Sequence, residues 1–236
     1  GYYGAAVKIK NILVSIVTSL GTVLLPRAAY YIEHQQMDEF KKLSRKALNF
    51  VFLVASPMMI YFMLFAKQGI YFLSGDAFGP AVVPMQLIMP TLLLIGITNI
   101  LGIQILVPLG YEKAVLVSEI VGAVIDLVVN ALLIPVYQSS GAAIGTLLAE
   151  FAVMVVQCIA LKNEIKTAFS DIKYLKIILA IIIASLASFW VTALNLHVFI
   201  TLVISAILFF GVYGLVLIIM KEKLVVEILT QIFNKL

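Results

Sequence analysis

The chain has 236 residues, of which 63% are hydrophobic and only 12% are charged, and its formal net charge is +4. A soluble domain carries roughly a quarter charged residues, so this chain has too few to cover a water-facing surface. The composition excludes an ordinary soluble domain and predicts a polytopic membrane protein. The basic residues lie between apolar runs, which argues against nucleic acid as a partner.

The chain begins with Gly1 at the edge of an apolar segment, and no signal-peptide pattern precedes it. We expect it to be the C-terminal part of a longer protein. The single cysteine, Cys158, lies in an apolar run, so a disulfide framework is not expected. His34 and His197 are far apart in the sequence and belong to no metal-ligand pattern, so neither a metal nor another cofactor is expected.

About 20 apolar residues span the hydrocarbon core of a bilayer. Apolar runs of this length recur along the chain. The runs lack the period-two alternation of barrel strands, so an all-α transmembrane helix bundle is expected. Seven spans are predicted, at residues 3–26, 47–66, 81–108, 113–136, 141–161, 174–195 and 197–220. Pro57 and Pro90 interrupt the second and third spans and are expected to kink them.

The segments between the spans differ strongly in charge. If the loops 27–46, 109–113 and 162–176 and the tail 221–236 share one side, that side holds thirteen of the 16 Lys and Arg residues. Basic loops favour the cytoplasm, so the C-terminus is predicted to be cytoplasmic. The tail has apolar residues at helical spacing, which is compatible with a helix that lies along the membrane surface. A frayed terminus is the alternative.

The first span carries a polar stripe on one helical face. The residues of this stripe are Lys8, Asn11, Ser15, Thr18 and Thr22. Because polar and ionised groups are costly in lipid, we expect this face to line protein or water, and we predict Lys8, Asn11 and Ser15 as substrate-binding residues. Lys10 points about 200° away from Lys8, and we expect its ammonium group to reach the membrane interface.

Acidic residues occur in the fourth and fifth spans. One face of the fourth span carries Glu119, Gly122, Asp126 and Asn130, and one flank of the fifth carries Thr146, Glu150 and Gln157. We predict Asp126, Asn130 and Glu150 as substrate-binding residues, because ionisable groups within a bilayer usually serve function. A purely structural contact between helices is the alternative for Asp126, and Glu119 lies nearer to the interface.

Two stretches resemble bacterial polysaccharide flippases of the Wzx type, which belong to the multidrug/oligosaccharidyl-lipid/polysaccharide exporter superfamily. They are "YGAAVKIKNILVSIVTSLGTVLLPR" and "ILVPLGYEKAVLVSEIVGAVIDLVVNALLIPVYQSSGAAIGTLLAEF". The matching positions in the second stretch are Pro108–Gly110, Lys113, Asn130, Ile134–Pro135, Gly141–Thr146 and Glu150. Asp126 departs from the family pattern, which usually has Asn there.

The resemblance implies the C-terminal lobe of a fourteen-helix exporter without its first helix at 1–161, two additional spans at 162–220 and a cytoplasmic tail at 221–236. It implies a flippase of the bacterial cytoplasmic (inner) membrane, which moves a polyprenyl-diphosphate-linked oligosaccharide by alternating access. Such a protein is not an enzyme. Lys8 would meet the anionic diphosphate. The implied partners are the lipid-linked oligosaccharide, membrane lipids and the N-terminal half of the same protein.

Other functions stay open on the residues alone. A cation-coupled multidrug exporter of the same fold would rely on acidic residues such as Asp126 and Glu150. A membrane-embedded enzyme of polysaccharide assembly would need a large extracytoplasmic loop with catalytic side chains, and the predicted outer loops are short. A scaffold subunit would use buried polar residues without transport. For a transporter, coupling to either protons or sodium is compatible with the sequence.

Overall fold

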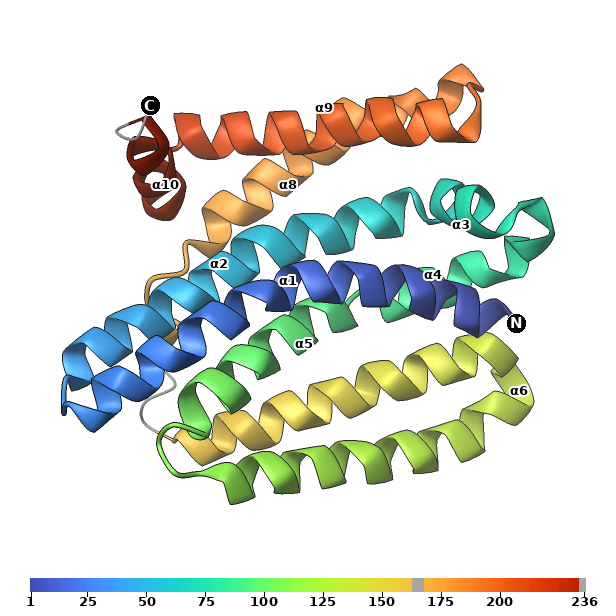
Figure 1. The fold of residues 1–236 in the computed structure, drawn as a ribbon. Coiled ribbons are helices and arrows are strands. Elements are labelled where there is room, and N and C mark those ends of the chain that lie inside the picture. Colours follow the sequence, from blue (N-terminus) through green and yellow to red (C-terminus); the bar gives the residue numbers. More distant parts are fainter. Residues whose placement is uncertain (163–167, 234–236) are drawn as a thin grey trace.

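The computed structural model describes residues 1–162 and 168–233, which form helices joined by short turns and contain no β-strand (Figure 1). The elements are α1 (Tyr2–Glu33), α2 (Met37–Leu64), α3 (Ala66–Ser74), η1 (Asp76–Ala81), α4 (Val82–Ile88), α5 (Thr91–Thr98), η2 (Asn99–Leu106), α6 (Glu112–Leu161), α8 (Tyr174–Phe189), η3 (Trp190–Leu194), α9 (Val198–Ile219) and α10 (Lys223–Phe233). The all-α prediction is confirmed. Continuous apolar runs satisfy their backbone groups within each helix, as a bilayer requires.

The first two helices extend beyond the predicted spans. α1 continues to Glu33 and α2 starts at Met37, so a turn around Gln35 with φ 58° replaces the predicted loop 27–46. That loop prediction was wrong because it ended each helix where the apolar run ends, whereas Lys, Arg and Glu are good helix formers in water. At 1.5 Å per residue α1 is about 48 Å long, longer than a hydrocarbon core of about 30 Å.

The predicted third span is broken at Pro90. The helical segments before and after this proline meet at an angle of 42°. Proline has no N–H to donate, and the hydroxyl of Thr91 instead donates to the Ile88 carbonyl at 2.6 Å. The expected kink at Pro90 is therefore confirmed, whereas α2 runs through Pro57 as one continuous element. After the break, α5 continues into the wider π-helical turn η2.

The α6 element is a helical hairpin. At Gln138 the backbone takes φ 49° and ψ −121°, and the chain reverses there so that the two halves run side by side (Figure 1). Gly141 lies directly after the turn, where a Cβ would be only 2.5 Å from the carbonyl oxygen of Leu133. A glycine is therefore required for the close approach of the two halves. The halves coincide with the predicted spans 113–136 and 141–161.

The C-terminal helices α8 and α9 pack against each other and against α2. Tyrosine hydroxyls connect this pair to the rest of the bundle. The hydroxyl of Tyr61 donates to the Leu202 carbonyl at 2.9 Å, and that of Tyr213 donates to the Leu53 carbonyl at 2.9 Å. Both bonds join a side chain to the main chain of a distant helix, so they fix the docking of the predicted additional spans on α2.

Replacing Tyr213 by phenylalanine is expected to lower the free energy of unfolding by about 0.6–1.5 kcal/mol, because a buried main-chain carbonyl loses its side-chain donor. The matched control is Tyr137→Phe, since that side chain is exposed. Unfolding of the purified variants in mixed micelles, followed by circular dichroism, measures the difference. Equal stability of the two variants would show that the bond does not contribute to docking.

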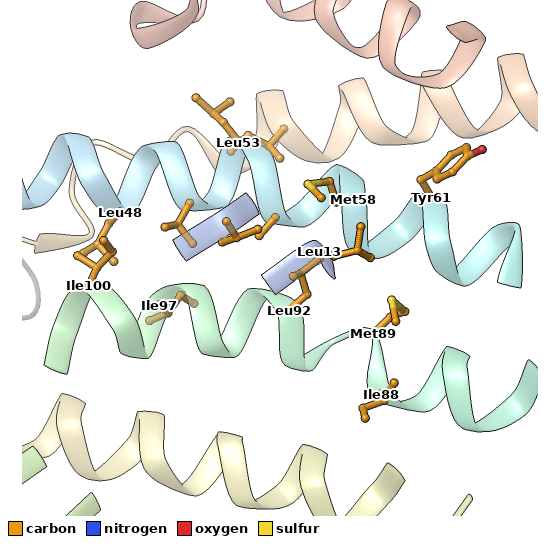
Figure 2. Close-up of a cluster of buried hydrophobic side chains, with 14 of the residues drawn as sticks. Leu13, Leu48, Leu53, Met58, Tyr61, Ile88, Met89, Leu92, Ile97 and Ile100 are labelled. Atoms are coloured by element: carbon orange, nitrogen blue, oxygen red, sulfur yellow. The ribbon is translucent and has the colours of Figure 1, made fainter. Parts of the chain in front are cut away.

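Buried apolar side chains of α1, α2, α4 and α5 form one cluster, shown in Figure 2. Leu13 of α1, Leu48 of α2 and Leu92 of α5 are all buried there. The first half of α6 takes little part in this cluster, since its buried residues are Ser118 and Gly122. The α6 hairpin consequently packs on the bundle mainly through its second half, and most apolar side chains of its first half are exposed.

Among the described residues, five helices are long and apolar enough to cross a membrane: α1, α2, α6, α9 and α8 with its extension η3. The bent segment around Pro90 makes a sixth if it is counted as one span. The predicted number of seven also counts the two halves of α6 separately. The seven-span topology stays a prediction, while the membrane helix bundle itself agrees with the structure.

Candidate functional site: an acidic groove in the α6 hairpin

A groove of about 230 Å³ lies between the two halves of α6. The first half supplies Glu119 and Asp126, and the second half supplies Thr146 and Glu150. Gly122 also lines the groove, and a Cβ there would lie 2.5 Å from the nearest atom of the opposite half. The shared helical face that the sequence predicts for Glu119, Gly122 and Asp126 is thus confirmed, because all three line one groove.

Two side-chain oxygen atoms of the first half of α6, one on the groove wall and one a helical turn beyond it, are buried without a hydrogen-bond donor among the described residues. They are Oδ1 of Asp126 and Oδ1 of Asn130. Both lie beside Gly145: a Cβ there would contact Asn130 Oδ1 and would be 3.2 Å from Asp126 Oδ1. Burying an oxygen of this kind without a partner is unfavourable. The pair therefore suits a donor, a proton or a cation.

A lysine of α1 approaches the same groove. Lys10 is half-buried and interacts electrostatically with Glu150. The two elements are also joined directly, because the hydroxyls of Tyr3 and Thr146 are 2.7 Å apart. The sequence analysis placed Lys10 at the membrane interface, but the structure gives it a neighbour inside the bundle, since packing turns this side of α1 toward α6.

The polar stripe of α1 lies away from the acidic groove. Lys8, Asn11 and Ser15 are all exposed, and the Ser15 hydroxyl donates to a main-chain carbonyl of its own helix at 2.7 Å. Thr18 is half-buried and likewise bonds within the helix. The side chain of Thr22 lies outside the described residues. The stripe is therefore the uncovered face of α1, opposite to the face that packs on the bundle.

The six predicted binding residues thus form two groups. Asp126, Asn130 and Glu150 meet at the α6 hairpin, whereas Lys8, Asn11 and Ser15 line the free face of α1. Sequence reasoning missed Tyr3 and Lys10 as neighbours of the acidic groove. Helical spacing gives the face of each side chain, but no signal in the sequence says which helix that face will meet.

The groove offers oxygen ligands in a partly buried setting. In residues 1–162 and 168–233, no set of three or more His, Cys, Asp or Glu side chains is arranged to hold a metal ion. The carboxylates of Asp126 and Glu150, together with the Asn130 amide, are suited to bind a single positive charge. A proton, a monovalent cation or an ammonium group such as that of Lys10 would supply it.

Comparison with known proteins supports the membrane assignment. No protein-family model matches the chain, and no solved structure matches it. The chain is 24% identical over 212 residues to an uncharacterized membrane protein of Methanocaldococcus jannaschii, a match that covers 90% of this chain and 42% of that protein. The chain thus spans less than half the length of the curated relative that it matches. With its long apolar helices, it is a membrane protein with several candidate spans.

Proposed function

We propose that the chain is the C-terminal transport lobe, with two additional helices, of a flippase that moves a polyprenyl-diphosphate-linked oligosaccharide across the membrane by alternating access. The remainder of the longer protein would form the opposite wall of the transport path. In secondary transporters, substrate binds near the midplane between two halves that rock against each other. The sequence resemblance to polysaccharide flippases supports the substrate class.

The observation that carries this proposal is the uncovered polar face of α1. Lys8, Asn11 and Ser15 are exposed on a helix whose opposite face packs on the apolar core. A lysine and an amide facing lipid would be unfavourable, so this face suits an aqueous vestibule. The Lys8 ammonium offers three donors and a compact charge, which would offset the loss of hydration when a diphosphate enters.

The acidic groove gives the proposed transporter a means of energy coupling. Neutralising Asp126 or Glu150 with a proton or a sodium ion would change the charge balance beside Lys10. The groove lies where the α6 hairpin meets α1, and the Tyr3–Thr146 contact transmits a shift of one helix to the other. A cation gradient would in this way bias α1, the helix that carries the proposed substrate-binding face.

The substitution Lys8→Gln in the full-length protein tests the proposal. We expect translocation of a fluorescent polyprenyl-diphosphate-linked sugar in proteoliposomes to fall about tenfold or more, because losing one partner of a desolvated charge pair costs about 2–5 kcal/mol. Lys8→Arg should retain most activity, since it keeps the charge. Lys67→Gln, which removes an exposed lysine above the Tyr71 ring, serves as the control. Normal translocation by Lys8→Gln would refute the proposal.

A cation-coupled multidrug exporter is the second candidate, and the acidic groove favours it. Organic cations would be attracted to Asp126 and Glu150, and Lys8 would then be dispensable. Efflux of a fluorescent organic cation by the same variants separates the two functions. Loss of drug efflux in Asp126→Asn, together with unchanged sugar-lipid translocation in Lys8→Gln, would favour the exporter over the flippase.

A further inference from the structure

A second polar pocket, of about 160 Å³, lies at the other side of the bundle, where α2, α10 and the segment just before α8 meet. Its walls include Lys46 of α2, Lys173 just before α8 and Lys223 at the start of α10. Figure 1 shows α10 beside the end of α9 and turned away from its axis. The charge asymmetry of the loops predicts this end of the bundle to be cytoplasmic.

A buried carboxylate next to the pocket holds the start of α10 against α2. Glu222 is only 1% exposed, and it accepts hydrogen bonds from Asn49 Nδ2 at 3.2 Å and from the Val225 N–H at 2.9 Å. Lys46 and Glu227 form an ion pair at 2.6 Å across the same junction. These contacts join α2 to α10 and give the pocket a fixed shape.

The cations around the pocket exceed its available anions. The two carboxylates on its rim are engaged, since Asp171 pairs with Arg45 at 3.5 Å and Glu227 pairs with Lys46. Lys173 and Lys223 are exposed, and no ion pair neutralises either of them within the described part of the chain. The pocket therefore presents two ammonium groups to a ligand with a negative charge.

The pocket also contains an acceptor that lacks a donor. Asn49 is only 6% exposed and lines the pocket, and its Oδ1 atom has no hydrogen-bond partner among the described residues. A buried acceptor of this kind is satisfied by a ligand that carries an O–H or N–H group. A bare anion would bind the lysines but would leave this oxygen unpaired.

The neighbouring surface is apolar and exposed. Leu224 of α10 is half-buried at the wall of the pocket, and Ile228, one turn further along the same helical face, is 40% exposed. An amphipathic helix with exposed apolar side chains and lysines at its start is typical of a helix that lies in the headgroup region of a bilayer. The ligand of this pocket is therefore expected to be part of the bilayer.

We propose that this pocket binds the headgroup of an anionic glycerophospholipid with free hydroxyl groups, such as phosphatidylglycerol. Lys173 and Lys223 pair with its phosphate, a headgroup hydroxyl donates to Asn49 Oδ1, and the apolar face of α10 lies against its acyl chains. Lipid binding holds α10 at the membrane surface. The hydrogen bond between Glu222 and Asn49 connects α10 to α2. This lipid site does not depend on the transport function proposed above.

Native mass spectrometry of the purified full-length protein, titrated with dihexanoyl-phosphatidylglycerol, tests the proposal. We expect the double substitution Lys173→Gln and Lys223→Gln to weaken binding about thirtyfold, because each lysine near an anionic headgroup contributes about fivefold. Lys113→Gln is the matched control, since it removes an exposed lysine from the predicted cytoplasmic side without touching the pocket. Equal weakening in the control and the double variant would overturn the site.

The headgroup chemistry is tested with two further probes. Dihexanoyl-phosphatidylmethanol carries the same single negative charge but no hydroxyl or N–H donor, so the unaltered protein should bind it about fivefold more weakly, as expected for one lost hydrogen bond. Inorganic phosphate should not displace the glycerolipid at equal concentration. Equal affinity for the two lipids, or displacement by phosphate, would overturn the proposal without bearing on transport.

Discussion

Alanine at position 141 is expected to destabilise the protein by about 2–4 kcal/mol. Alanine normally stabilises a helix interior relative to glycine by about 0.5–1 kcal/mol. At Gly141, however, the new Cβ would lie 2.5 Å from the Leu133 carbonyl oxygen and 2.9 Å from the Ile134 nitrogen. Both are main-chain atoms that cannot rotate away, so the α6 hairpin would have to open. The acidic groove between its two halves would then lose its shape.

The matched control for this substitution is Gly211→Ala in α9. A Cβ at Gly211 meets no other atom within 4 Å, so the same chemical change should be neutral or slightly stabilising there. Unfolding of both variants in mixed micelles gives the free-energy difference. Similar stability of Gly141→Ala and Gly211→Ala would mean that the two halves of α6 are not as closely packed as the structure shows.

If the groove couples the proposed transport to a cation gradient, Asp126→Asn is expected to reduce strongly the response of transport to that gradient. The side chain keeps its size and one oxygen, but it can no longer take up a proton or carry a negative charge. Coupling between two sites is typically worth about 1–3 kcal/mol, so gradient-driven transport should fall about 5- to 150-fold. Glu119→Gln is the control, since Glu119 lines the same groove but is exposed.

Proteoliposomes with an imposed pH gradient, and others with an imposed sodium gradient, measure this coupling separately. Loss of stimulation in Asp126→Asn under only one of the two gradients identifies the coupling ion. Stimulation equal to that of the unaltered protein under both gradients would show that the groove is not the coupling site. The result is independent of Lys8→Gln, which tests substrate recognition at the other face of α1.

The sequence predicted the helical character of the chain, but not the helix ends. Most residues of the long apolar runs are helical in the structure, although the run 81–108 is broken at Pro90. The hydrogen bonding of α1 and α2 does not stop at the edge of such a run. Residues 27–33 and 37–46 are helical in the region predicted as a loop, because the Ala, Glu, Lys and Arg residues there have high helix propensity although they are not apolar enough to count as a span.

The acidic groove was predictable in part. The spacing of Glu119, Gly122 and Asp126 placed them on one face, and the structure confirms that face as a wall of the groove. The position of Lys10 was not predictable in the same way. Its angle from Lys8 follows from helix geometry, but its approach to Glu150 depends on how α1 packs against α6.

Taken by itself, the sequence determined that this protein is a bundle of membrane helices and which residues share a helical face. These properties depend on composition and on the fixed rotation per residue, which act within each helix. Only the tertiary structure decided which faces meet: the reversal at Gln138, the Tyr3–Thr146 contact and the burial of Glu222 against Asn49. Such contacts join residues far apart in the chain, and they depend on the packing of all the helices at once.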